Sequence, residues 1–383
     1  MISIYASGLY IGSGIGIFIG GLIVDNWNNA YPIISEAPFG LKGWQVAFMA
    51  VGIPGMLLAL LTWQIKEPPR GLSEGLISSE SKNPLKETFK ELVGLTPFGL
   101  VGSDNFKKEL SINIIFTVLI FLASYYLYVL TGDFLQWTAF GIGVYVICNW
   151  IHGLKNRDPV AFLLIFKSKA LLLGLLSFPF ITFVTYALGA FGPSFYIRNF
   201  SMTATEVGII YGLITVFGSM IGVICGGILG DKLRETYVNG KLYLIMASAV
   251  LTGVTAIGFI HSENLVASFT WKFVYHIAST AWLGCAASTV TELVLPRLRA
   301  VASAFFILML SMIGLALGPY LTGMVSDIYI NSGLLPGPAL KNAMTLTLVV
   351  LVLPFGLLAV ACKYLKNDEA EIYEKARSLG EEI

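Results

Sequence analysis

The stretch SGLYIGSGIGIFIGG at residues 7–21 identifies the class of this protein. It lies in an apolar run over about residues 3–24. A helix needs about 20 apolar residues to cross the hydrocarbon core of a bilayer. We therefore expect the chain to open inside a membrane-spanning helix, with no leader segment before it.

Composition supports a membrane protein. Of the 383 residues, 56% are hydrophobic and 12% are charged, whereas a soluble domain has about 25% charged residues. The net charge of +1 gives no footprint for nucleic acid. The four cysteines have no paired spacing and are interpreted as packing residues: Cys148, Cys225, Cys285 and Cys362. We expect no metal and no cofactor.

Hydropathy predicts an all-α polytopic membrane protein with about ten transmembrane helices. The predicted spans are residues 3–24, 44–65, 110–131, 134–153, 166–190, 205–229, 243–260, 270–293, 299–325 and 343–364. An even number of spans places both termini on one side. All but four of the 24 Lys and Arg residues then fall on that side, the exceptions being Lys42, Arg198, Lys272 and Lys341. Positive loops face the cytoplasm, so we predict cytoplasmic termini and a multi-pass protein of the inner (cell) membrane.

The spans divide the chain into five predicted segments. They are a two-helix unit (1–66), a cytoplasmic linker (67–109), an inserted hairpin (110–154), a six-helix bundle (155–365) and a cytoplasmic tail (366–383). In the linker, apolar residues at 85, 89, 92 and 93 predict an amphipathic helix, either on the membrane surface or solvated. The hairpin turns at residues 131–133, is rich in aromatics and is interpreted as facing lipid. The tail has helical charge spacing.

Two predicted spans carry a glycine at every fourth position. Such bare stripes let another helix approach closely, either to rock against it or to pack statically. The first stripe is Gly8, Gly12, Gly16 and Gly20, and the second is Gly218, Gly222, Gly226 and Gly230.

The sequence GGILGDKLR at residues 226–234 ends one span on the predicted cytoplasmic side. An aspartate there can accept hydrogen bonds from the N-terminus of a neighbouring helix, and the bases can pair with acids across the loop. We interpret the cluster as a gating latch, the alternative being a plain end-of-helix charge cluster. Its members are Gly226, Gly227, Gly230, Asp231, Lys232 and Arg234.

This Gly-x-x-x-Gly-Asp-Lys pattern resembles the loop signature of the major facilitator superfamily, in its second-half copy. Further stretches resemble the Spinster branch of that family. They are residues 42–48, 51–55, 66–71, 191–195, 202–208, 295–304, 313–319 and 326–327. The resemblance covers about residues 4–70 and 166–365.

The resemblance implies a major facilitator fold. Family members have twelve helices in two halves, and the first span here is similar to their fifth. It therefore implies a partial N-terminal half, a complete C-terminal six-helix bundle and a hairpin inserted between them. The family's coupling residues lie on the helices that precede this point.

The implied function is that of a secondary transporter, or a fragment of one, working by rocker-switch alternating access. The Spinster resemblance implies a small amphipathic or lipid-like substrate, such as a lysophospholipid or a sphingoid base. It leaves coupling to protons open.

Several polar or aromatic residues in the spans are candidates for the substrate pathway. His276 is an ionisable residue inside a span, which suggests function, although a satisfied packing histidine is the alternative. The candidates are Tyr186, Arg198, Tyr211, His276 and Trp282. By contrast, Glu206 completes a capping box with Thr203 and is interpreted as structural.

Glu292, near the inner end of its span, is predicted to pair with Arg297 or Arg299, or with the bases of the Asp231 loop. Such a pair would belong to the inner gate, the alternative being a plain surface pair.

Two other function classes remain. A non-transporting protein that binds lipid or a partner chain is the alternative. A membrane enzyme is disfavoured because no histidine–acid pairing or activated serine is evident, and the absence of a P-loop disfavours an ATP-driven pump. The expected ligands are an amphipathic solute and membrane lipid, with the oligomeric state open.

Overall fold

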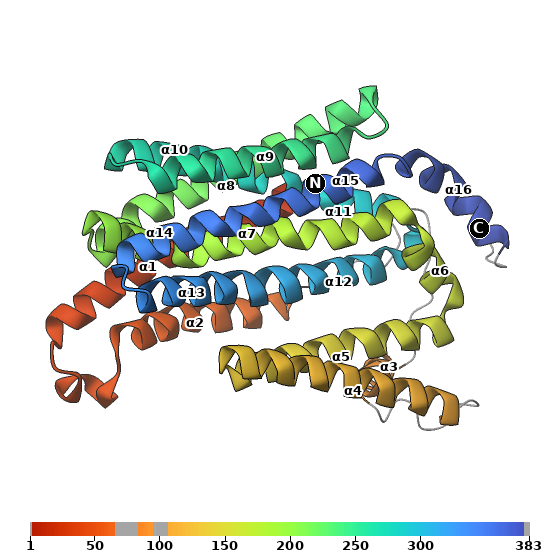
Figure 1. The fold of residues 1–383 in the computed structure, drawn as a ribbon, viewed down its shortest axis with the longest axis horizontal. Coiled ribbons are helices and arrows are strands. Elements are labelled where there is room, and N and C mark those ends of the chain that lie inside the picture. The colour runs from red at the N-terminus through yellow and green to blue at the C-terminus, as the bar shows by residue number, and fades with distance from the viewer. Residues whose placement is uncertain (1, 66–82, 95, 97–105, 379–383) are drawn as a thin grey trace. The chain divides into compact units, whose positions relative to one another are not determined.

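The structure, a computed structural model, describes residues 2–65, 83–94, 96 and 106–378. The helices that it contains are α1 (Ile2–Ala30), α2 (Gly43–Thr62), α3 (Pro84–Gly94), α4 (Phe106–Thr131), α5 (Phe134–Arg157), α6 (Pro159–Lys167), α7 (Lys169–Phe200), α8 (Ala204–Thr236), α9 (Gly240–His261), α10 (Leu265–Thr280), α11 (Trp282–Glu292), α12 (Arg299–Met309), α13 (Ala316–Asn331), α14 (Pro336–Thr347), α15 (Val352–Ala361) and α16 (Leu365–Ser378) (Figure 1). Two compact units result, one of residues 1–54 and 164–383 and the other of residues 55–163.

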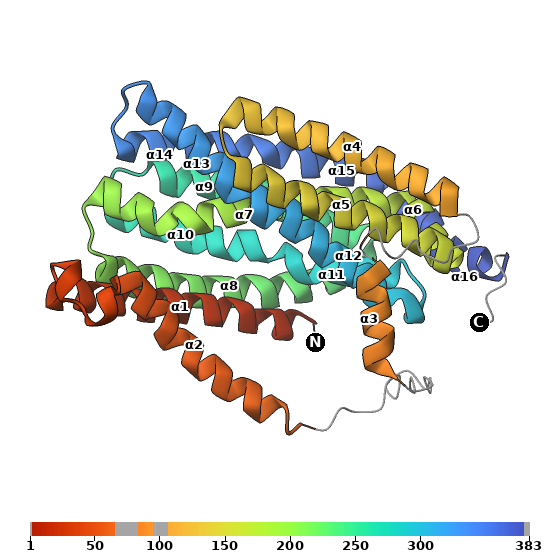
Figure 2. The ribbon, with the colours of Figure 1, turned by 90° about the horizontal axis from the view of Figure 1, so that it is seen from below.

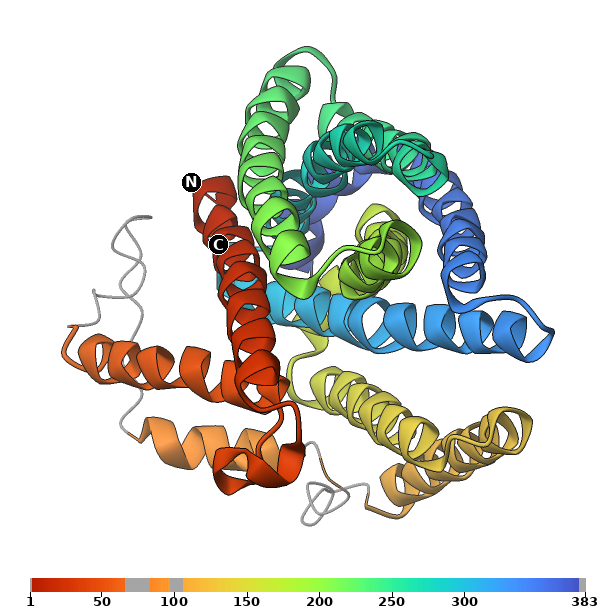
Figure 3. The ribbon, with the colours of Figure 1, turned by 90° about the vertical axis from the view of Figure 1, so that its left-hand side faces the viewer.

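Helix α7 lies at the centre of the first unit. It contacts α8, α11, α13, α14 and α15, and the end-on view shows it surrounded by other helices of the unit (Figure 3). Its buried residues include Phe178, Ile181 and Phe195. An apolar helix that is buried over most of its surface is the expected centre of a membrane bundle.

Local sequence explains where the helices of this unit begin. The predicted capping box at the start of α8 is confirmed, because Thr203 Oγ1 accepts from Glu206 N and Glu206 Oε2 accepts from Thr203 N. Asn264 caps α10 by accepting from the backbone N–H groups of Val266 and Ala267. These side chains satisfy donors that a helix N-terminus otherwise leaves free.

The predicted tail helix is confirmed as α16, and it is attached to the start of α7. The Asp368 carboxylate is 8% exposed. It accepts from Ser168 Oγ at 2.9 Å and from Ala170 N at 2.8 Å. One side chain of α16 therefore satisfies an N-terminal donor of α7.

Nine helices of the described residues are long and apolar enough to cross a membrane, one fewer than predicted. The difference is the predicted span at 270–293, which forms two helices, α10 and α11, joined at Ala281. The break lies where α8 comes closest, since a Cβ at Gly226 would lie 2.1 Å from the Ala281 carbonyl oxygen. At 16 and 11 residues, neither helix alone reaches the ~20 residues of a span.

The second unit contains α3, which is the predicted amphipathic helix, and α4 and α5, which form the predicted hairpin. The turn between α4 and α5 contains Gly132 at φ 82°, a conformation that glycine adopts without strain. Asn113 and Asn149 are buried between these helices and share a hydrogen bond of 2.9 Å. Asn149 also donates to the carbonyl oxygens of Gly94 and Thr96, which fastens the end of α3 to α5.

The prolines at 68 and 69, which form part of the family resemblance, lie outside the described residues, as do residues 379–383 of the tail.

Candidate functional site

Helices α1 and α8 lie side by side in the first unit (Figure 2). Gly14 and Gly21 of α1 face Gly212 and Gly208 of α8, and a Cβ at Gly14 would lie 2.6 Å from the Gly212 carbonyl oxygen. Small residues permit this approach of two backbones.

The predicted stripe of α1 is not the surface that packs on α8. At Gly8, Gly12, Gly16 and Gly20, no atom of another described residue lies within 4 Å of an added Cβ. At about 100° per residue this stripe lies on the opposite side of α1 from Gly14 and Gly21. The predicted helix packing at these four glycines is therefore not found among the described residues.

The glycine stripe of α8 does form a close helix contact. An added Cβ would lie 2.8 Å from His276 Cβ at Gly218 and 2.3 Å from the Ile277 carbonyl oxygen at Gly222. It would also collide with Ala281 at Gly226 and with Cys285 at Gly230, whereas Gly227 is half-buried. These contacts hold α8 against α10 and α11.

At the end of α8, three charged residues form the Lys241 cluster: Asp231, Lys241 and Glu292. The side chain of Lys241 is 9% exposed. It donates to Glu292 Oε1, and its Nζ lies 3.7 Å from Asp231 Oδ1. The Glu292 and Asp231 side chains are 42% and 77% exposed.

This geometry decides between the predicted pairings. Glu292 pairs with Lys241, a base of the next helix α9 that lies ten residues after Asp231. Asp231 was predicted to accept hydrogen bonds from a helix N-terminus. In the structure its carboxylate instead lies beside the Lys241 ammonium. The reason is that Lys241 occupies the first turn of α9 and brings its ammonium beside both carboxylates.

The other predicted gate residues lie nearby but separately. Arg234 Nη2 contacts Glu369 Oε2 at 2.5 Å, and Arg234 Nη1 donates to the Val238 carbonyl oxygen, so α8 is tied to α16. Arg299 Nε donates to the Thr291 carbonyl oxygen at 3.3 Å, at the end of α11. Lys232 and Arg297 are exposed.

A second polar group lies within the helices and is named here the Lys272 cage: Lys272, Tyr211, Phe259 and Tyr275. Lys272 is 0% exposed. Its Nζ lies 4.2 Å from the ring centroid of Phe259, 4.4 Å from that of Tyr275 and 5.0 Å from that of Tyr211. These distances are within the range of cation–π contacts.

His276 borders the cage, one turn after Lys272. Its Nδ1 lies 3.2 Å from Ser219 Oγ and its Nε2 lies 3.4 Å from Thr215 Oγ1. Both ring nitrogens therefore have partners on α8, which agrees with the alternative of a satisfied packing histidine. The ring also packs edge-on against Tyr211, with 5.8 Å between centroids.

The remaining pathway candidates are not brought together. Trp282 is 2% exposed, and its ring centroid lies 6.0 Å from that of Phe178. Its indole N–H donates to the Ser279 carbonyl oxygen. It is therefore a packing residue here, because a buried and hydrogen-bonded ring lines no open path. Tyr186 and Arg198 are exposed on α7.

Sequence reasoning missed Lys241 and Lys272 as site residues. One available signal for Lys272 was a charged residue inside a predicted span, four residues before His276 and hence on the same helix face. No comparable signal marks Lys241, because its partners are ten residues before it and 51 residues after it.

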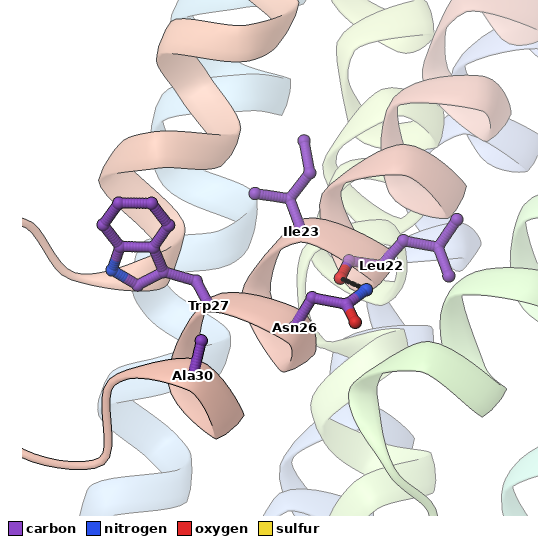
Figure 4. A pocket seen from close by; sticks show the side chains of 5 residues that line it. All are labelled: Leu22, Ile23, Asn26, Trp27 and Ala30. Atoms are coloured by element: carbon purple, nitrogen blue, oxygen red, sulfur yellow. Dashed lines mark hydrogen bonds between the residues drawn. The ribbon is translucent and has the colours of Figure 1, made fainter.

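A surface pocket on α1 carries no comparable chemistry. It is lined by Leu22, Ile23, Asn26, Trp27 and Ala30 (Figure 4). Its one amide group, that of Asn26, donates back to the Leu22 carbonyl oxygen at 2.7 Å. Within the described ranges, no group of three or more His, Cys, Asp or Glu residues could hold a metal ion.

Comparison with known proteins gives consistent matches. The family described as the Major Facilitator Superfamily matches residues 1–319. A Mycolicibacterium smegmatis protein named MFS-type efflux pump is 30% identical over 201 residues, which are 52% of this chain and 45% of that protein. Protein spinster of Drosophila melanogaster is 26% identical over 173 residues, covering 42% of this chain and 28% of that protein.

Among solved structures, the fold is similar to that of a bacterial homolog to the human lysosomal transporter Spinster, in an inward-facing and unoccupied conformation. The TM-score is 0.52 at 21% identity, with 98% of this chain and 71% of that chain covered. The chain thus spans less than half the length of the two curated relatives named above.

Proposed function

This chain belongs to the Major Facilitator Superfamily. We therefore propose that it is a secondary transporter, or part of one, and that it moves a small amphipathic solute by alternating access. The chain is a multi-pass integral membrane protein with nine candidate spans among its described residues. The observation that carries the proposal is the Lys272 cage, in which a lysine of α10 is fully buried against the candidate spans α8 and α9. Intramembrane charge is costly and marks substrate or ion pathways.

The close contact of α1 with α8 supports a moving interface, because α1 belongs to the predicted two-helix unit and α8 to the predicted six-helix bundle. Glycines there bring backbones together without interlocking side chains, and secondary transporters work by rocking packed bundles against each other. The Lys241 cluster lies at the end of α8. In the proposal it is the latch that stabilises one conformation and releases in the other.

Similarity to Spinster proteins supports a lipid-like solute, such as a lysophospholipid or sphingoid base. The charge asymmetry of the loops supports cytoplasmic termini in a cell membrane. Sidedness can be measured by the labelling of single cysteines introduced at exposed positions of α16 and of the α9–α10 loop in intact cells. The proposal requires labelling of the loop only.

The test of transport uses the purified full chain in liposomes. A fluorescent lysophospholipid and a fluorescent sphingoid base are followed with and without a pH gradient. Flux of either probe above that of empty liposomes supports the proposal, and a dependence on the gradient supports proton coupling. Binding of the probes without flux would favour the alternative, a lipid-binding membrane protein.

The latch is tested by Asp231→Asn. Because this side chain is 77% exposed, its loss should leave folding intact, while the loss of its charge beside Lys241 should lower flux. Glu235→Gln, the same type of change at an exposed residue of α8 outside the latch, serves as the control and should leave flux unchanged. Equal flux in the Asp231→Asn variant and the unmodified chain would refute the latch.

A further inference from the structure

Three polar atoms of the Lys272 cage are buried without a hydrogen-bond partner in the structure: Lys272 Nζ, Tyr211 Oη and Tyr275 Oη. The described residues include only two other such atoms, in His152 and Asn239. Buried polar groups are nearly always paired, so an unpaired ammonium with two unpaired hydroxyls on the rings beside it needs a physical explanation.

The neighbouring polar side chains do not provide these partners. The hydroxyls of Thr215 and Ser219 contact His276 and do not reach Lys272. The Ser279 hydroxyl donates to the His276 carbonyl oxygen at 3.4 Å and also borders the Tyr275 hydroxyl, one turn before it. Tyr211 Oη lies against α7, only 2.3 Å from where a Cβ of Gly192 would be. Lys272 Nζ and Tyr211 Oη therefore have no partner among these side chains.

The charge of the cage is also uncompensated. No carboxylate of the described residues forms an ion pair with Lys272. Aromatic faces offset part of the cost of a buried ammonium, but an unpaired buried charge remains expensive. By contrast, the buried ammonium of Lys241 has two carboxylates beside it.

All three unpaired groups can donate. A lysine ammonium can only donate, and a tyrosine hydroxyl donates through its O–H. A cation would be repelled by Lys272, and a neutral donor would leave its charge unpaired. An oxyanion supplies several acceptor oxygens and the opposite charge in one group.

We propose that the Lys272 cage binds the oxyanion group, phosphate or carboxylate, of the ligand that this protein carries. Lys272 provides the charge, Tyr211 and Tyr275 donate hydrogen bonds, and the Phe259 ring covers one side of the ammonium. The cage is closed in the described structure, so entry of a ligand requires the helices around it to move. The inference rests on the proposed function and deepens it, because it names the chemical group by which the ligand is held.

Binding is measured by calorimetry on the purified full chain in uncharged detergent. Dodecyl phosphate is the amphipathic probe, inorganic phosphate the free anion and dodecyl glucoside the uncharged control. Lys272→Met should weaken dodecyl phosphate binding about ten- to hundredfold, the range for a hydrogen bond to a charged group. Lys366→Met, at an exposed residue of α16, should bind as the unmodified chain does.

Two tyrosine-to-phenylalanine variants distinguish a role in ligand binding from a role in packing. Tyr275→Phe removes a hydroxyl that borders the ammonium and should weaken binding severalfold without loss of thermal stability. Tyr196→Phe removes a hydroxyl that already contacts Ser268 Oγ at 3.1 Å, so it should lower stability and leave binding unchanged. If Lys272→Met does not fold, this pair and Lys272→Arg, which keeps the charge, still decide the question.

The outcomes are distinct. Equal binding of dodecyl phosphate by the unmodified chain, Lys272→Met and Tyr275→Phe would overturn the proposal. Binding of both phosphates with the same dependence on Lys272 would support an oxyanion site for free anions, and binding of dodecyl phosphate alone would support an amphipath. If binding depends on Lys272 but liposomes show no flux, the binding site is supported and transport is refuted. If liposomes show flux but binding does not depend on Lys272, transport is supported and the binding site is refuted.

Discussion

The two glycine stripes can be compared by a matched pair of substitutions. Gly226→Ala places a Cβ 2.1 Å from the carbonyl oxygen and 2.5 Å from the Cα of Ala281. Both atoms belong to backbone, so the helices must move apart. Overpacking of this kind costs about 1–3 kcal/mol. Gly12→Ala, where no atom lies within 4 Å, should instead stabilise α1 by about 0.5–1 kcal/mol through helix propensity.

The assay is thermal unfolding of both variants in one detergent, followed by circular dichroism at 222 nm. We expect the apparent midpoint to fall for Gly226→Ala and to rise slightly or stay unchanged for Gly12→Ala. An unchanged midpoint for Gly226→Ala would refute the close contact of α8 with α10 and α11. An equal fall for both variants would show that the stripe on α1 is covered in the purified protein.

Three further substitutions test other contacts. Asp368→Ala should cost about 1–2 kcal/mol, because it removes the acceptor of Ser168 Oγ and Ala170 N at the start of α7, and limited proteolysis should then release α16 sooner than in the unmodified chain. Arg234→Gln should cost at most about 1 kcal/mol, and its effect should shrink in high salt, as salt titration of the melting midpoint would show. Asn149→Leu should cost about 1–3 kcal/mol by leaving the buried Asn113 amide nitrogen without its acceptor. The double variant with Asn113→Leu should recover part of that loss, and no recovery would argue against the pair.

The helices and several of their ends follow from short-range patterns. Apolar run length predicts the spans, and the Thr203–Glu206 box predicts the start of α8, because both effects act within a few residues. The amphipathic helix α3 and the turn at Gly132 were predictable for the same reason. The span predicted at 270–293 is divided at Ala281 into α10 and α11, although Ala281 itself keeps helical dihedrals (φ −60°, ψ −28°). This division coincides with the approach of Gly226 of α8, which lies 55 residues earlier in the chain.

Packing partners were harder to predict than spans. In a membrane, lipid tails are as apolar as leucine, so hydrophobicity does not distinguish a lipid-facing side from a packed one. Spacing alone therefore predicted packing at both glycine stripes, whereas the structure packs α1 through Gly14 and Gly21. The pairing of Lys241 with Asp231 and Glu292 was hidden likewise, because three different helices bring these charges together.

The sequence by itself determined the membrane class, the spans, the family resemblance and the presence of charges within the helices, since each depends on composition or local order. Tertiary structure alone decided which glycines touch another helix and which groups surround Lys272. The reason is that Tyr211, Phe259 and Tyr275 come from α8, α9 and α10. Their meeting around one ammonium depends on how three apolar helices rotate against each other, which hydropathy in a bilayer does not specify.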